Sequence, residues 1–125
     1  KNSNCKSFKS LGQTVYYSLL KKASVVVGNS SSGIIETPFF SIPCVNIGRR
    51  QEGRFKAKNI IDCTANTKII TKSIKIGMSK KFKKLANVVS NPYGNGMTSK
   101  KITSILEKLL SKKIDIKKKF IDTKL

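Results

Sequence analysis

A run of small polar residues followed by a carboxylate is the part of this sequence best suited to binding a ligand. Ser30, Ser31 and Ser32 carry three consecutive hydroxyls, Gly33 follows them, and Glu36 comes three residues later. Hydroxyl donors and a residue without a side chain allow a diphosphate to approach the backbone closely. A carboxylate such as Glu36 can accept hydrogen bonds from two ribose hydroxyls. The pattern is compatible with a nucleotide site, while an ordinary surface loop with a dipole-favoured glutamate explains these residues taken alone at least as well.

A second candidate is an arginine-rich loop at residues 48–54, where Arg49, Arg50 and Arg54 lie among glycines. Guanidinium groups can bind a phosphate through two parallel hydrogen bonds. A solvated basic loop without a ligand is the competing interpretation. Both loops are expected to leave the same end of adjacent strands, so we expect them to converge on one anion.

Groups able to catalyse a reaction are scarce in this sequence. It contains no His, which removes the commonest general base and every Ser/His or Cys/His nucleophile pair. The three cysteines, Cys5, Cys44 and Cys63, stand far apart and form no CxxC motif, so a metal site and a disulfide framework are both disfavoured. We expect no cofactor, no membrane-spanning segment and a reducing, cytoplasmic compartment.

The first half of the chain is predicted to alternate between helices and strands. Apolar spacing predicts a helix over residues 13–23, with one stripe that contains Val15, Tyr16, Leu19 and Leu20. The β-branched run at residues 24–28 is typical of a strand buried on both faces. A short helix is predicted from residue 33 to about residue 40. If Gly33 caps that helix, Glu36 occupies its third position.

The rest of the chain is predicted to add two strands, at residues 43–47 and 59–62, and then helices only. The helices are expected at residues 66–77, 79–88 and 99–111. A strand, a small-residue loop, a helix and another strand make half of a doubly wound sheet, in which ligands lie beyond the carboxyl ends of the strands. The fold class is therefore α/β, with an incomplete parallel sheet flanked by helices.

Charge raises a different possibility, because 26 Lys and Arg residues against 6 Asp and Glu give a net charge of +20. Such a balance is typical of nucleic-acid-binding proteins. The lysines are spread along the whole chain, however, and aromatic residues do not alternate with the basic runs as a base-stacking surface requires. A nucleic-acid partner is therefore disfavoured but stays an alternative.

Four blocks, in order, resemble the hydrolysing UDP-N-acetylglucosamine 2-epimerases. Residues 28–36 read Gly-Asn-Ser-Ser-Ser-Gly-Ile-Ile-Glu, residues 42–48 Ile-Pro-Cys-Val-Asn-Ile-Gly, residues 50–54 Arg-Gln-Glu-Gly-Arg, and residues 91–96 Asn-Pro-Tyr-Gly-Asn-Gly. The resemblance runs from about residue 9 to residue 110. The related non-hydrolysing enzymes carry Ser-Gly-Gly at the first block, so the Asn-Ser-Ser-Ser-Gly form favours the hydrolysing branch. Ser41 departs from the usual Gly of the family.

The resemblance implies a role for particular residues. Ser30 and Ser31 resemble diphosphate-binding residues beside Gly33, Glu36 resembles a ribose-binding carboxylate, and Arg50 corresponds to an arginine that faces the phosphates. The segment around Lys9 and Leu11 matches a loop that lies against the uracil. The implied UDP-binding set is Lys9, Leu11, Ser30, Ser31, Gly33, Glu36 and Arg50.

The resemblance also implies the architecture called GT-B, which has two Rossmann-like domains. In this architecture UDP is bound mainly by the C-terminal domain. Residues 1–111 are expected to form that domain, and residues 112–125 a basic tail. The catalytic carboxylates of the family belong to a first domain that these residues do not match, and a histidine of the family contributes near the hinge, whereas this sequence contains no His. We therefore expect the 125 residues alone to be inactive and to expose surface that the missing domain covers, which favours self-association. A non-hydrolysing epimerase or another GT-B nucleotide-sugar enzyme is the alternative.

Overall fold

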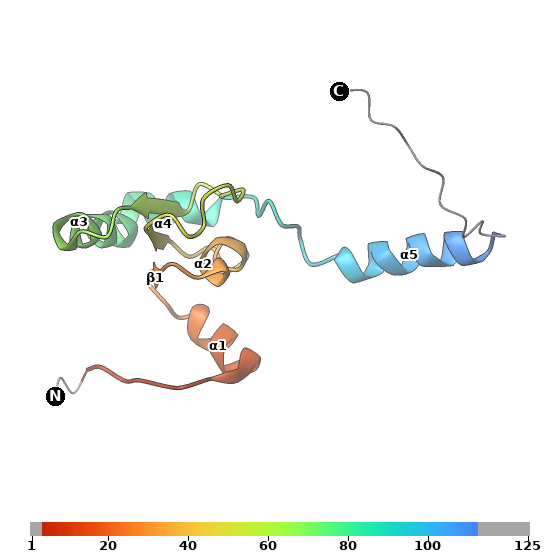
Figure 1. Cartoon of the computed structure of the whole chain (residues 1–125), viewed down its shortest axis with the longest axis horizontal. Coiled ribbons are helices and arrows are strands. Elements are labelled where there is room, and N and C mark those ends of the chain that lie inside the picture. The colour runs from red at the N-terminus through yellow and green to blue at the C-terminus, as the bar shows by residue number, and fades with distance from the viewer. Residues whose placement is uncertain (1–3, 113–125) are drawn as a thin grey trace, which may run out of the picture. The chain divides into compact units, whose positions relative to one another are not determined.

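The computed structural model describes residues 4–112, and the chain divides into two compact units between Tyr93 and Gly94. The first unit contains all the strands and four of the helices, and the second contains the helix α5 (Figure 1). The predicted basic tail begins at the edge of the described residues, and residues 113–125 lie outside them. In chain order the elements are α1 (Gly12–Leu20), β1 (Val26–Gly28), α2 (Ser31–Ile35), β2 (Cys44–Ile47), β3 (Ile60–Cys63), α3 (Thr67–Met78), α4 (Lys80–Asn87) and α5 (Thr98–Leu110).

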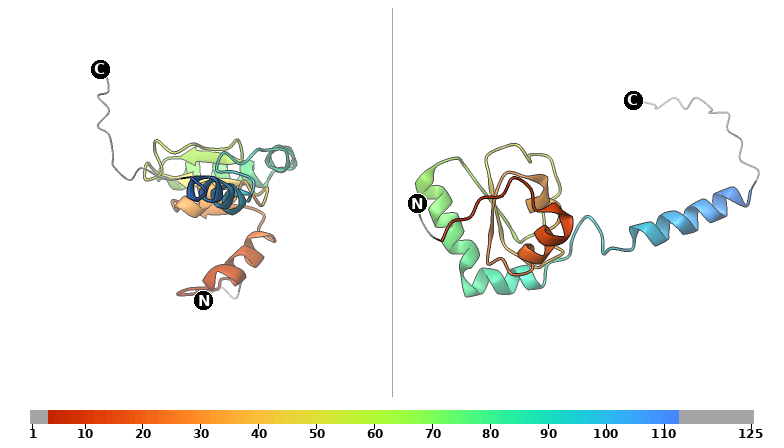
Figure 2. Two further views of the ribbon diagram at one scale, coloured as in Figure 1. Left: turned by 90° about the vertical axis from the view of Figure 1, so that its right-hand side faces the viewer. Right: turned by 90° about the horizontal axis from the view of Figure 1, so that it is seen from below.

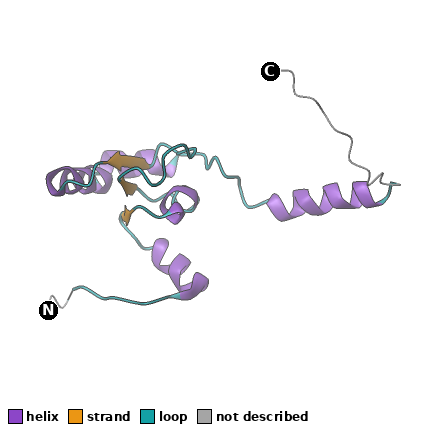
Figure 3. Ribbon diagram, viewed as in Figure 1, coloured by secondary structure: helices purple, strands orange, loops and turns teal. Residues whose placement is uncertain are grey.

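The three strands form one parallel sheet in the order β1-β2-β3 (Figure 3). Val26 is paired with Cys44 and Gly28 with Asn46, while Ile47 is paired with Cys63 on the next strand. All three strands therefore end at the same edge of the sheet. This arrangement confirms the predicted α/β class and the incomplete parallel sheet flanked by helices.

Helices cover the two faces of the sheet, and small residues allow them to approach it closely. On one face α2 contacts β2, where a Cβ placed on Gly33 would lie 2.7 Å from the sulfur of Cys44. On the other face α3 contacts β2 and β3, and a Cβ on Gly77 would lie 3.3 Å from Val25 and 3.5 Å from Pro43. The core between these layers is centred on β2.

The prediction that the first strand is buried on both faces is wrong. β1 begins at Val26, and Val27 keeps 42% of its surface exposed. Within the described residues β1 pairs with β2 alone, so it lies at an edge of the sheet. A continuous β-branched run indicates a strand, but it does not report how many neighbours that strand has.

Two predicted helices differ from those in the structure. The apolar stripe of α1 is only partly buried, because Leu20 lies in the core while Val15 and Leu19 are about half exposed. The predicted helix from residue 33 to about residue 40 is instead α2, which begins at Ser31 and ends at Ile35. Turns follow it, and Ser41 adopts a left-handed φ of 58°, a conformation that favours glycine.

The helices of the second half lie close to their predicted positions. Asn66 caps α3 by accepting hydrogen bonds from the backbone N–H groups of Lys68 and Ile69. Ser79 then adopts an extended backbone, so that α4 turns away from the end of α3 (Figure 2). In the second unit α5 has no buried residue, and its apolar stripe, which includes Ile102, Ile105 and Leu106, is exposed.

Candidate functional site

The loop after β1 leads directly into α2, and its cap differs from the expected one. Ser30, not Gly33, caps the helix, because its side chain accepts a hydrogen bond from the backbone N–H of Ser32 at 3.3 Å. Glu36 consequently lies at the C-terminal end of α2, and the expectation that it occupies the third helical position is wrong. Serine is a better N-cap than glycine when its oxygen can reach such an N–H, and this preference moves the helix start.

The three consecutive serines have different surroundings. The hydroxyl of Ser32 donates to the Oε2 atom of Glu36 at 2.6 Å. Ser30 is exposed and Ser31 is half-buried, and no hydrogen bond among the described residues uses the Ser31 hydroxyl. Ser30 and Ser31 therefore keep donor capacity for a ligand, whereas Ser32 is used within the protein.

Two tyrosines of α1 complete the surroundings of Glu36. The Tyr16 hydroxyl is hydrogen-bonded to Ser32 Oγ, and the Tyr17 hydroxyl donates to Glu36 Oε1 at 3.4 Å. The Tyr17 ring also packs against Phe40, with ring centroids 5.4 Å apart. The sequence places Tyr16 in an apolar stripe and Ser32 among the hydroxyl donors for a diphosphate, so it does not predict this polar network. Hydroxyl-bearing aromatics within an apolar stripe were the available signal.

A buried amide joins the arginine-rich loop of residues 48–54 (the arginine loop) to the small-residue loop of residues 29–33 (the serine loop). Gln51 is 3% exposed, and its Nε2 donates to the backbone carbonyl of Asn29 at 2.8 Å. This contact supports the expectation that both loops lie at one edge of the sheet. Arg50, the residue before Gln51, is exposed. Arg49 instead forms an ion pair with Glu52 at 2.9 Å.

A second buried chain of hydrogen bonds holds α2 from the side of the core. The Thr37 hydroxyl donates to the carbonyl of Gly33 at 2.6 Å, and Asn59 Nδ2 donates to Thr37 Oγ1 at 3.0 Å. Asn59 also donates to the carbonyl of Ile42 at 2.7 Å. Thr37 and Asn59 are fully buried, so neither hydrogen bond competes with water.

Cys44 lies against α2 as a neutral thiol. Its burial, together with the negative charge of Asp62, raises the pKa of the Cys44 thiol to about 12. Because the thiolate is the nucleophilic form of cysteine, Cys44 is a packing residue. Its sulfur fills the space that a side chain at residue 33 would need, which gives Gly33 a structural reason independent of any ligand.

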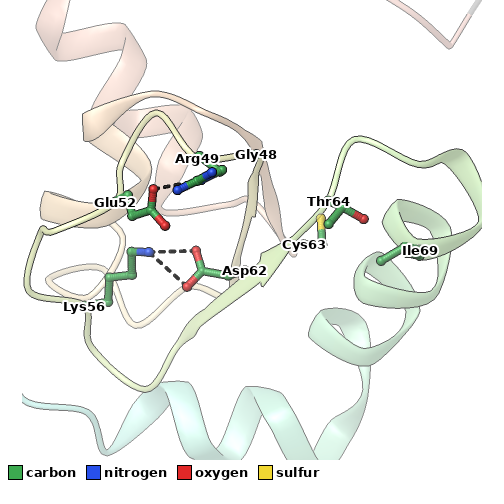
Figure 4. A pocket seen from close by; sticks show the side chains of 8 residues that line it. All are labelled: Gly48, Arg49, Glu52, Lys56, Asp62, Cys63, Thr64 and Ile69. Atoms are coloured by element: carbon green, nitrogen blue, oxygen red, sulfur yellow. Dashed lines mark hydrogen bonds and ion pairs between the residues drawn. The ribbon is translucent and has the colours of Figure 1, made fainter.

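A hollow of about 460 Å³ lies at the ends of β2 and β3, next to the arginine loop (Figure 4). Lys56 crosses it to bind both carboxylate oxygens of Asp62, at 2.9 and 3.0 Å, and Asn46 donates to the same carboxylate at 2.6 Å. None of the residues predicted to bind UDP lines this hollow. The full lining is Gly48, Arg49, Glu52, Lys56, Asp62, Cys63, Thr64 and Ile69.

The remaining predicted site residues lie before α1. Lys9 is exposed, and Leu11 is the half-buried N-cap residue of α1. No hydrogen bond among the described residues joins either of them to the serine loop or to the arginine loop. Their connection to the site is α1 itself, whose tyrosines reach Ser32 and Glu36.

The described residues contain no group of three His, Cys, Asp or Glu side chains arranged to hold a metal ion.

No helix within residues 4–112 is long and apolar enough to cross a membrane.

An open parallel sheet with helices on both faces, and with polar loops at the carboxyl ends of its strands, defines the class of Rossmann-like α/β domains. Residues 1–107 match the UDP-N-acetylglucosamine 2-epimerase family. This match covers most of the sequence, and the chain belongs to that family.

Individual relatives agree with this assignment. The chain is 55% identical over 67 residues, 53% of its length, to the GDP/UDP-N,N'-diacetylbacillosamine 2-epimerase (hydrolyzing) of Campylobacter jejuni. It is 34% identical over 79% of its length to the UDP-N,N'-diacetylbacillosamine 2-epimerase (hydrolyzing) of Legionella pneumophila. It is 31% identical over 95% of its length to the UDP-N-acetylglucosamine 2-epimerase of Neisseria meningitidis. The matched segment spans only 17%, 25% and 31% of these three relatives.

Proposed function

We propose that this chain is the UDP-binding part of a hydrolysing UDP-N-acetylglucosamine 2-epimerase of the GT-B type. The observation that carries the proposal is the hydrogen bond between Gln51 and Asn29, which brings the loop of Ser30 and Ser31 next to the loop of Arg50. Hydroxyl donors and an exposed guanidinium at one sheet edge suit a diphosphate.

Glu36 adds a place for the ribose, since each of its carboxylate oxygens accepts one hydrogen bond from the protein and retains a second lone pair. Lys9 and Leu11, at the start of α1, are proposed to contact the uracil. The complete proposed UDP-binding set is therefore Lys9, Leu11, Ser30, Ser31, Gly33, Glu36 and Arg50. Gly33 serves this set by letting α2 pack tightly on Cys44.

The proposed reaction of the whole enzyme begins with loss of UDP from the nucleotide sugar by anti elimination. Water then adds to the resulting glycal-like intermediate and leaves free N-acetylmannosamine, for use in sialic-acid-type sugar biosynthesis. The proton transfers need acid and base groups that a first domain is proposed to supply, as the resemblance to the family implies. The diacetylbacillosamine enzymes among the relatives make a diacetamido sugar an alternative substrate.

Calorimetric titration of the 125-residue chain with UDP and with uridine tests the binding part of the proposal. We expect a dissociation constant between micromolar and millimolar, roughly −8 to −4 kcal/mol. Glu36→Ala and Arg50→Ala should each weaken UDP binding about tenfold or more, as expected for hydrogen bonds to charged groups. Arg54→Ala removes an equal charge from the same loop and should stay within about twofold.

Three outcomes would contradict the proposal. A folded chain that binds no UDP would remove its mechanism, and tight nucleic-acid binding with a steep salt dependence would then favour the basic-module alternative. Release of N-acetylmannosamine by the pure 125-residue chain would show that no further domain is needed. A longer form of the enzyme that retains UDP on its product would identify the non-hydrolysing reaction instead.

A further inference from the structure

The hydroxyl network between α1 and α2 has a defined direction. A serine hydroxyl carries one proton, and that of Ser32 is donated to Glu36 Oε2 at 2.6 Å. Tyr16 must therefore be the donor in its hydrogen bond with Ser32 Oγ. Tyr17 donates its own proton to Glu36 Oε1 at 3.4 Å and accepts from Gln13 Nε2 at 3.2 Å. Every proton of the network points toward the carboxylate.

This direction leaves Glu36 with an ordered set of free acceptor positions. A carboxylate has two lone pairs on each oxygen, and Ser32 and Tyr17 each use one, on different oxygens. One lone pair therefore remains on Oε1 and one on Oε2. Two adjacent acceptors in a fixed plane match the two donors of a vicinal diol, such as the 2′- and 3′-hydroxyls of a ribose.

We propose that Ser32, Tyr16 and Tyr17 are positioning residues that present Glu36 to the ribose diol of the nucleotide, and that they give the site its preference for ribonucleotides over deoxyribonucleotides. The inference rests on the proposed UDP site. The contribution should be graded, because the bond from Ser32 is short and direct, Tyr16 acts through Ser32, and the bond from Tyr17 is long.

A purely structural role must be distinguished from this one, since the same bonds also hold α1 against α2. Loosening the two helices would weaken binding of any nucleotide, whether or not it has a 2′-hydroxyl. Misplacing the carboxylate would weaken UDP, which offers it two hydroxyls, more than 2′-deoxy-UDP, which offers it only the 3′-hydroxyl. The ratio of the affinities for UDP and 2′-deoxy-UDP therefore separates the two roles.

The test is a calorimetric titration of the full 125-residue chain with UDP and with 2′-deoxy-UDP. We expect the wild-type chain to prefer UDP by about tenfold, the value of one hydrogen bond to a charged group. Ser32→Ala should reduce that preference to about twofold, Tyr16→Phe to an intermediate value, and Tyr17→Phe least. Affinity for 2′-deoxy-UDP, which keeps its 3′-hydroxyl, should fall less than affinity for UDP in every variant.

Two further variants control for folding. Ser32→Thr keeps a donor and should restore the preference, and Tyr93→Phe removes a hydroxyl that instead binds the carbonyl of Phe55, so it should change nothing. Equal loss of both affinities in Ser32→Ala would overturn the inference, as would a wild-type chain that binds UDP without any ribose preference. Both results leave the proposed UDP site standing through its diphosphate contacts with Ser30, Ser31 and Arg50. A folded wild-type chain that binds neither nucleotide removes both.

Discussion

Replacing Gly33 by alanine should destabilise the protein only while the sulfur of Cys44 is present. The added Cβ would lie 2.7 Å from that sulfur, about 1 Å inside ordinary contact distance. Inserting a methyl group into a packed core typically costs about 1–3 kcal/mol. Gly33 lies within α2, where alanine is favoured over glycine by roughly 0.5–1 kcal/mol. The net expectation for Gly33→Ala is a loss of about 1–2 kcal/mol.

Removing the sulfur should reverse the sign of this effect. In the Cys44→Ala background the clash is absent, so Gly33→Ala should be neutral or stabilising by up to about 1 kcal/mol. The coupling energy between the two substitutions is therefore expected at about 1–3 kcal/mol. The four proteins of this double-mutant cycle can be compared by urea unfolding followed by far-UV circular dichroism, with the slope of the transition checked for constancy.

The outcome that would refute the reasoning is equally specific. If Gly33→Ala costs the same free energy in both backgrounds, Cys44 is not what excludes a side chain at residue 33. If it is harmless in the native background, α2 can move away from β2 without loss. Such a movement would also disturb the hydrogen bond from the Thr37 hydroxyl to the carbonyl of Gly33. Thr37→Val should then lower the free energy of unfolding less in Gly33→Ala than in the wild type.

Two further predictions concern Cys44 and Gln51. The folded protein raises the Cys44 pKa from 9.0 to about 12, so the neutral thiol stabilises the fold fully below pH 9 and loses this contribution as the pH rises from 9 toward 12. The free energy of unfolding should therefore fall more steeply with pH in the wild type than in Cys44→Ala. An equal slope in the two proteins would contradict a buried neutral thiol at this position. Gln51→Ala should weaken UDP binding by about three- to tenfold while changing uridine binding little, because its hydrogen bond to Asn29 sets the distance between the two loops proposed to contact the diphosphate. Equal effects on UDP and uridine in calorimetry would argue against that role.

Much of the fold follows from local patterns in the sequence. The β-branched run at residues 24–28, which ends in glycine, predicts β1, because β-branched residues are typical of strands. The spacing of apolar residues in the second half predicts α3, α4 and α5 within one or two residues. The capping side chains of Asn66 and Ser79 act on neighbouring residues, so their effect is readable along the chain.

What the sequence did not reveal depends on partners that are distant in the chain. Gln51 binds a backbone atom 22 residues earlier, and Asn59 reaches Thr37 across the same separation. The exposure of Val27 likewise depends on how many strands flank β1, which no local pattern contains. The start of α2 differs from the predicted one for a smaller reason: a serine and a glycine compete for one cap, and the serine oxygen reaches an N–H.

These distant contacts explain how so short a helix can offer an ordered binding surface. A helix of five residues, like α2, has no stability of its own, because nucleation costs more than its few hydrogen bonds return. The structure holds α2 from outside: Tyr16 binds Ser32 on one side, and on the other Asn59 binds Thr37, whose hydroxyl binds the Gly33 carbonyl.

The same contacts have a consequence for the proposed ligand. Gln51 fixes the carbonyl of Asn29 just before Ser30, so the free hydroxyls of Ser30 and Ser31 belong to a segment held at both ends. A nucleotide that binds there would lose little affinity to ordering the loop. Affinity for the nucleotide should accordingly depend on the residues that hold α2 in place as well as on the few residues that contact the nucleotide directly.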